Sequence, residues 1–179
     1  MDHDDHVRLI RAGVEGTGPV WADLGSGGGA FTLALADLLG PDGVIHSVDR
    51  DASALRTQAD AVRGRFPATT LHQVVGDFTR PLGLPTLDGV VMANSLHFVR
   101  DKLPVLALVR GYLGPAGRLV LVEYDAEHGN PWVPYPISAG RWPSLAAAAG
   151  FEDIRELTRV PSRFLGAIYS AMADSGTRP

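Results

Sequence analysis

Apolar residues recur along this chain at two spacings, which predict strands and helices in alternation. Short apolar runs are typical of buried strands, whereas apolar residues three and four positions apart mark one face of a helix. Apolar runs predict strands at residues 19–24, 44–48, 71–75, 90–93, 119–122, 154–160 and 164–172. Helical spacing marks residues 7–14, 31–39, 55–62, 103–113 and 142–149, and Gly or Pro follows each of them closely.

This alternation predicts an α/β fold with a doubly wound, mostly parallel sheet. Only residues 161–163 join the last two predicted strands, and so short a link requires those two strands to be antiparallel. No repeat or linker divides the 179 residues, so we expect one domain over 1–179 with a short N-terminal helix. Residues 80–85 leave room for a short helix at most, and the three prolines within residues 125–138 predict an exposed loop.

A glycine-rich loop lies between the first predicted strand and the helix that follows it. The loop has the sequence Gly-Ser-Gly-Gly-Gly at residues 25–29, so that glycines occupy the alternate positions Gly25, Gly27 and Gly29. Such a loop lets the backbone approach a ligand closely, and the helix N-terminus behind it suits a carboxylate or a phosphate. The spacing also fits the dinucleotide fingerprint, so the loop alone does not separate S-adenosylmethionine (SAM) from NAD.

Three carboxylates follow three successive predicted strands and favour SAM. Asp23 would repel a pyrophosphate but suits the ammonium and sulfonium groups of SAM. Asp49 can accept hydrogen bonds from both ribose hydroxyls, in NAD as well as in SAM. Asp77 can accept a bond from the adenine amino group, with Phe78 packed on the ring. Each Asp alone is equally typical of a turn or a helix cap, but all three together favour a binding site.

At this point the chain resembles the class I SAM-dependent methyltransferase family. The resemblance rests on residues 20–29 (VWADLGSGGG), 48–49 (VD), 76–78 (GDF), 87–94 (LDGVVMAN), 113–119 (LGPAGRL) and 149–151 (AGF). It implies a seven-stranded sheet of order 3-2-1-4-5-7-6 in which only strand 7 is antiparallel. It also implies that SAM is the cofactor and S-adenosylhomocysteine the product.

The resemblance further implies a role for each cofactor residue. Asp23 and the loop residues Gly25, Ser26, Gly27 and Gly29 would hold the methionine part, and Asp49 the ribose. Asp77 and Phe78 would face the adenine, and Asn94 would border the methyl donor. Arg50 stands where many members have an apolar residue, so it either stacks on the adenine or points to water. The N-terminal lid of the family is short here.

The candidate catalytic residues follow the fourth and fifth predicted strands. His97 lies three residues beyond Asn94 and is our candidate base, because an unperturbed histidine titrates near pH 6.5. A packing or capping role for His97 is an equal alternative. Tyr124 and His128, with Glu123 beside them, either line the acceptor pocket or belong to a solvated loop.

Composition narrows the classes of partner. The chain has no cysteine, which excludes disulfides and thiolate metal sites, and a net charge of −4 without a Lys/Arg cluster argues against nucleic acid. No apolar stretch is long enough for a membrane helix, and residues 1–6 are acidic rather than typical of a secretory signal, so a cytoplasmic location is the default expectation. We interpret the cluster of His3, Asp4, Asp5 and His6 as a frayed, solvated terminus and expect no metal.

Two alternatives to a methyltransferase remain at this stage. A catalytically silent SAM-binding module is one, because no catalytic residue is certain from sequence. An NAD-dependent oxidoreductase is the other; Asp23 disfavours it, and Lys102 has no tyrosine four residues before it. Short insertions between the predicted elements favour a small-molecule acceptor. The sequence does not indicate an oligomeric state.

Overall fold

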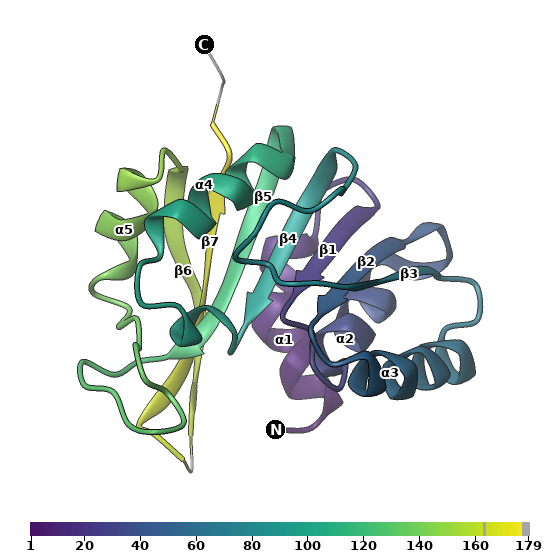
Figure 1. Cartoon of the computed structure of the whole chain (residues 1–179), viewed down its shortest axis with the longest axis horizontal. Helices are drawn as coiled ribbons and strands as arrows, with labels where there is room; N and C mark the ends of the chain where they lie inside the picture. The colour runs from purple at the N-terminus through teal and green to yellow at the C-terminus, as the bar shows by residue number, and fades with distance from the viewer. Residues whose placement is uncertain (163, 177–179) are drawn as a thin grey trace.

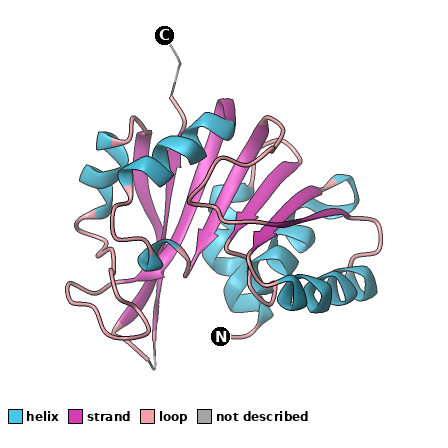
Figure 2. Cartoon of the chain, viewed as in Figure 1, coloured by secondary structure: helices cyan, strands magenta, loops and turns pink. Residues whose placement is uncertain are grey.

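A computed structural model describes residues 1–162 and 164–176 of the chain and contains one seven-stranded sheet (Figures 1 and 2). The strand order is β3-β2-β1-β4-β5-β7-β6, as expected from the resemblance. The strands are β1 (Val20–Leu24), β2 (Val44–Asp49), β3 (Thr70–Val75), β4 (Leu87–Ala93), β5 (Leu113–Tyr124), β6 (Glu152–Pro161) and β7 (Ala167–Asp174). Strands β1 to β5 pair in parallel, whereas β7 is antiparallel to both β5 and β6.

Helices cover both faces of the sheet. They are α1 (His3–Val14), α2 (Ala30–Leu39), α3 (Ala52–Arg65), α4 (Leu103–Tyr112) and α5 (Trp142–Ala148), with short 3₁₀ turns η1 (Gly40–Asp42) and η2 (Leu96–Phe98). In Figure 1, α4 and α5 lie in front of the sheet and α1 and α2 behind it, and α3 contacts α2. No described helix is long and apolar enough to cross a membrane.

The two faces of the sheet bury different halves of each central strand. Along β5, Leu119 and Leu121 enter the core beneath α4 and α5, whereas Val120 and Val122 enter the core beneath α1 and α2. Successive strand residues point to opposite faces, so a continuous apolar run fits a strand that is covered on both sides. This is why the short apolar runs of the sequence predicted the central strands.

The parallel pairing brings the carboxyl ends of β1, β2, β4 and β5 to one edge of the sheet. In Figure 1 this edge is at the bottom, where the N-terminus also lies. Ligands of open α/β sheets bind at this edge, beside the point where the strand order reverses. The glycine loop after β1 and the turn η2 after β4 are therefore neighbours at that reversal.

Several sequence expectations were wrong in detail. Strand β5 begins at Leu113 rather than at residue 119, and β7 begins at Ala167 rather than at residue 164. Residues 125–138 do form a loop, but Val133, Ile137 and Ser138 in it are buried, because the loop folds back beside η2. The absence of a helix between β3 and β4, in contrast, agrees with the expectation that residues 80–85 leave room for a short helix at most.

The N-terminus is also more ordered than expected. The interpretation of residues 3–6 as a frayed terminus is wrong, because α1 begins at His3 and Asp2 caps it through a bond from the Asp5 amide. His3 Nε2 lies 2.8 Å from Asp37 Oδ2, and the His6 ring meets the Phe31 ring edge-on at 4.9 Å. These contacts dock the first turn of α1 against α2.

Candidate active site

The glycine loop is held in place by its own amides. The N–H groups of Gly25 and Ser26 donate to Val48 O at 2.8 and 3.1 Å, and Gly27 N donates to Asp49 Oδ2 at 2.8 Å. Gly25, Gly27 and Gly29 all have positive φ, a conformation that side-chain-bearing residues rarely adopt. The loop is thus fastened to the end of β2, and its outer surface stays open.

A buried polar chain behind the loop fixes Asp23. Thr32 Oγ1 donates to Asp23 Oδ2 at 2.6 Å, and Gln58 Nε2 donates to Thr32 Oγ1 at 2.8 Å. Ser47 Oγ donates to Gln58 Oε1 and shares a 2.9 Å bond with Ser26 Oγ. This hydrogen-bonded chain joins β1, β2, α2 and α3 below the loop, and the sequence analysis did not identify Thr32, Ser47 or Gln58.

Burial changes the charge state of Asp23. The side chain is 1% exposed, and desolvation raises its pKa to about 7, against the opposing effect of the bond from Thr32. The carboxyl group therefore gains or loses its proton near neutral pH. A cationic ligand in the neighbouring cavity would favour the ionised form.

Asp49, Arg50 and Asp77 gather at the ends of β2 and β3. Asp49 accepts from Gly27 N and, through Oδ1, from Asp51 N at 2.8 Å. Arg50 forms a 2.5 Å ion pair with Asp77, whose other oxygen accepts from the amide and hydroxyl of Thr79. The bond from Arg50 is the main cause that lowers the pKa of Asp77 to about 2. The Arg50 side chain is 71% exposed and pairs with Asp77, a contact that the sequence did not predict.

Two cavities meet above the glycine loop. One, of about 580 Å³, is lined by Asp23, the loop and the first turn of α1; the other, of about 240 Å³, by Asp49, Arg50, Phe78 and Phe98. Both are lined by Gly25 and Asn94. The structure thus brings all ten predicted cofactor residues except Gly29 and Asp77 to a cavity wall, and those two support the residues that do line one.

The residues at this junction fit the parts of SAM. Asn94 has φ +51°, and its Oδ1 is buried without a hydrogen-bond partner among the described residues, so it offers an acceptor for a donor such as an ammonium. A Cβ added to Gly27 or Gly28 would meet only open space, which leaves room for a ligand on the loop. At Gly25 a Cβ would lie 2.5 Å from Ser95 Cβ, so only glycine fits there.

A buried histidine and a buried glutamate pair at the ends of β4 and β5. His97 Nδ1 lies 2.7 Å from Glu123 Oε2, and the backbone N–H of His97 donates to Glu123 Oε1 at 3.0 Å. Their side chains are 3% and 0% exposed. No hydrogen bond from a described residue reaches His97 Nε2. The sequence analysis placed His97 and Glu123 near the ends of the fourth and fifth strands but did not predict that they pair. Parallel pairing of β4 with β5, which brings the two strand ends together, was the signal from which the pair could have been predicted.

Aromatic side chains surround this pair on the solvent side. The His97 ring lies 4.3 Å from the Phe98 ring and 6.1 Å from that of Tyr124, and Tyr124 meets Phe164 edge-on at 5.6 Å. Phe164 in turn meets Trp132 at 6.2 Å. His128, in contrast, is exposed on the loop after β5, and no contact of it with His97 or Glu123 is described.

Comparison with known proteins identifies the family. Residues 22–119, more than half of the chain, match the family described as "Methyltransferase domain". The chain therefore belongs to the class I SAM-dependent methyltransferases and is a SAM-dependent methyltransferase. That assignment favours SAM over NAD as the cofactor.

Three relatives illustrate the family. The chain is 27% identical over 176 residues to a reducing polyketide synthase, grgA, of a Penicillium species, covering 86% of this chain and 7% of the synthase. It is 31% identical over 105 residues to the ubiquinone/menaquinone biosynthesis C-methyltransferase UbiE of Pasteurella multocida, covering 58% of this chain and 39% of UbiE. The chain thus spans well under half the length of each of these two relatives. The solved structure of the CurJ carbon methyltransferase has the same fold, with a TM-score of 0.72 at 19% identity over 91% of this chain and 50% of CurJ.

Proposed function

We propose that this enzyme methylates a carbon atom of a small molecule whose C–H bond is made acidic by a neighbouring carbonyl, with His97 as the base. The observation that carries the proposal is the buried bond between His97 Nδ1 and Glu123 Oε2. A carboxylate in this position fixes which ring nitrogen holds the proton. Because Nδ1 must donate to Glu123, Nε2 keeps its lone pair and can accept a proton.

Glu123 acts as a positioning residue in this proposal. One of its oxygens holds the ring of His97 and the other holds the backbone of the same residue. The imidazole is therefore fixed at two points, and the positive charge that it gains with a proton lies next to a carboxylate. Hydrogen bonds to a charged group are stronger than those between neutral groups.

The proposed reaction begins with removal of a proton from the acceptor carbon. The acceptor C–H bond breaks, its proton goes to His97 Nε2, and its electron pair remains on the acceptor as an enolate. When bound, SAM would supply a methyl group on a positively charged sulfur: the electron pair of the enolate would form the new bond to the methyl carbon, and the methyl–sulfur bond would break to leave a neutral thioether. The Asp23 carboxylate, Asn94 Oδ1 and the glycine loop would hold the methionine part, Asp49 the ribose, and Phe78 the adenine.

The acceptor class is supported by the relatives and by the surface around the base. UbiE is named as a C-methyltransferase, and the grgA match lies in a polyketide synthase. Exposed Phe98, Trp132 and Phe164, which are 51–69% exposed, offer an apolar surface beside His97. Such a surface suits an uncharged or aromatic acceptor chain.

Proton exchange tests the base without methyl transfer. With S-adenosylhomocysteine and an acetoacetyl thioester in D₂O, the parent enzyme should exchange the protons between the two carbonyls, as followed by NMR. His97→Ala should slow the enzyme-dependent exchange by about 10²–10⁴-fold. His72→Ala, on the exposed edge strand β3, is the matched control. Equal exchange in the His97→Ala enzyme and the parent would contradict the assignment, and a loss in His128→Ala instead would move the role to that residue.

A further inference from the structure

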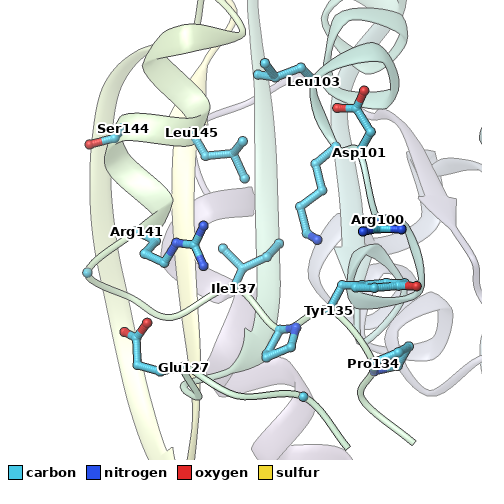
Figure 3. A pocket seen from close by; sticks show the side chains of 14 residues that line it. Arg100, Asp101, Leu103, Glu127, Pro134, Tyr135, Ile137, Arg141, Ser144 and Leu145 are labelled. Carbon is cyan, nitrogen blue, oxygen red and sulfur yellow. The ribbon is translucent and has the colours of Figure 1, made fainter. Parts of the chain in front are cut away.

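A further cavity lies outside the cofactor site. It has a volume of about 760 Å³ and shares no lining residue with the two cavities above the glycine loop. Its walls are residues 100–103, which follow η2, and residues 127–145, which belong to the loop after β5 and to α5 (Figure 3). A cavity of this size is typical of a small-molecule site.

Three cations face this cavity. Arg100, Lys102 and Arg141 line it together with the carboxylates Asp101 and Glu127. In the described part of the chain, neither carboxylate lies within ion-pair distance of any of the three cations, and neither arginine has a hydrogen bond from its side chain. Figure 3 shows the Arg141 guanidinium directed toward Ile137, with Arg100 and Tyr135 on the opposite wall.

Lys102 is the most informative of the three. It is 9% exposed, its Nζ donates to Val99 O at 2.7 Å, and it lies 5.8 Å from the centre of the Tyr135 ring. An ammonium group has three protons to donate, and no described residue accepts the other two. Burial is the main cause that lowers the pKa of Lys102, and Arg141 lowers it further, while Glu123 and Asp101 oppose the change. Glu123 and Asp101 act on Lys102 only from beyond ion-pair distance, so an anion in direct contact with this buried ammonium group would be stabilised.

The cavity is also joined to the proposed base. Tyr135, in its wall, donates its backbone N–H to the carbonyl of His97 at 3.0 Å. Each wall also follows one member of the buried pair in the chain. Residues 100–103 lie just beyond His97, and the loop from residue 125 follows Glu123. A molecule bound in the cavity therefore lies next to the turn that carries the base.

We propose that this cavity binds an anionic group, phosphate or carboxylate, at the end of the methyl acceptor opposite to the reacting carbon. Arg100, Lys102 and Arg141 supply the positive charge, and Ile137, Leu145 and Tyr135 receive the apolar chain between the two ends. This inference rests on the proposed carbon methylation for its acceptor. The cavity then selects acceptors that carry a charged tail, whereas the aromatic surface near His97 receives their reacting end.

Direct binding tests the anion site without any acceptor. Inorganic phosphate and acetate are titrated separately into ¹⁵N-labelled protein, at an ionic strength held constant with sodium chloride, and the backbone amides of residues 100–103 and 140–142 are followed by NMR. Arg141→Gln and Lys102→Met should each weaken binding of the preferred anion by about tenfold or more, because a bond to a charged group is lost. Arg56→Gln, an exposed position on α3, should not. Unchanged SAM-induced thermal shifts show that the variants are folded, and Arg141→Gln suffices if Lys102→Met is not.

Turnover then tests the acceptor. Two acetoacetyl thioesters of the same linear alkyl thiol are compared, one with a terminal phosphate and one with a terminal hydroxyl, over a series of chain lengths. At one length the phosphate should raise kcat/KM by about tenfold or more, and Arg141→Gln should abolish that advantage, whereas Arg56→Gln should keep it. A terminal carboxylate in place of the phosphate distinguishes the two anions.

The outcomes separate the two proposals. Equal turnover of charged and uncharged compounds at every length, or anion binding that both variants leave unchanged, overturns the anion site. Turnover of neither compound, with anion binding that Arg141→Gln weakens, overturns the acceptor class and keeps the anion site.

Discussion

The two halves of the active-site edge are built differently. The cofactor half lies at the ends of β1 to β3. It is held by backbone hydrogen bonds from the glycine loop to Val48 and by the buried hydrogen-bonded chain of side chains that links Asp23 to Ser26. The acceptor half, at the ends of β4 and β5, rests on one buried pair, His97 and Glu123, surrounded by exposed aromatic rings. The cofactor half can therefore hold one ligand shape with little movement. The shape of the acceptor half, in contrast, can change with the loops that carry its aromatic side chains. This difference suits a family with a common cofactor and diverse acceptors.

The largest expected effect is on turnover, from the acceptor half alone. Glu123→Gln should reverse the bond to His97 Nδ1, because the amide donates a proton there, and so place the remaining ring proton on Nε2. Turnover should fall by about 10²–10⁴-fold, while SAM affinity measured by calorimetry stays within twofold. The double variant with His97→Ala should lose little more than either single variant, because the two residues act together. Additive losses would mean that the two residues act independently.

The next effect falls on the stability of the cofactor half. A Cβ at Gly29 would lie 2.3 Å from Gln58 Cγ, and the backbone there has φ +85°. Gly29→Ala should therefore lower the free energy of unfolding by about 2–4 kcal/mol, as overpacking and a left-handed backbone combine. Gly28→Ala, whose Cβ meets open space, should change it by less than about 1 kcal/mol in the absence of ligand. Urea unfolding of both variants measures the difference; equal losses would show that the fit to Gln58 does not matter.

A third effect depends on pH. Because the folded protein keeps the proton of Asp23 up to a pKa of about 7, instead of 3.8, this group lowers stability progressively as pH rises from about 4 to about 7. Asp23→Asn removes that dependence. Between pH 5 and pH 8 the free energy of unfolding of the variant should gain on the parent by at most about 3 kcal/mol. A difference that is the same at both pH values would show that Asp23 is ionised throughout.

The smallest effect is on SAM affinity. Asp49→Ala should weaken SAM binding by about tenfold or more, because the ribose loses bonds to a charged group and Gly27 N loses its acceptor. Asp51→Ala is the matched control: Asp51 caps α3 through bonds from Ser53 N and Ala54 N but lines neither cofactor cavity. Calorimetry should show an unchanged SAM affinity for the control. Equal losses in both variants would point to a general loosening of α3.

The difference between the cofactor half and the acceptor half also explains which parts of the site could be predicted from the sequence. The alternation of strands and helices and the positions of Asp23 and Asp49 at strand ends follow from hydrophobic runs, which are local signals, whereas the strand order and the role of Asn94 came from the family resemblance. The pairing of His97 with Glu123 joins residues 26 positions apart in the chain and becomes visible only when β4 and β5 lie side by side. Gln58 is similar, because a glutamine in a helix carries no mark of the glycine that it packs against. The cations of the large cavity lie on separate segments and form no cluster in the sequence.

The docking of α1 has a consequence for the time scale of the reaction cycle. Met1, Asp2, His3 and His6 form one wall of the cavity beside the glycine loop, so a molecule held there is partly enclosed by the first turn of α1. That turn is attached by a hydrogen bond between His3 and the exposed Asp37 and by the contact with Phe31. Contacts of this kind open locally far more often than the domain unfolds. We expect the rate at which this turn opens to set the residence time of bound S-adenosylhomocysteine, and with it the interval between successive turnovers.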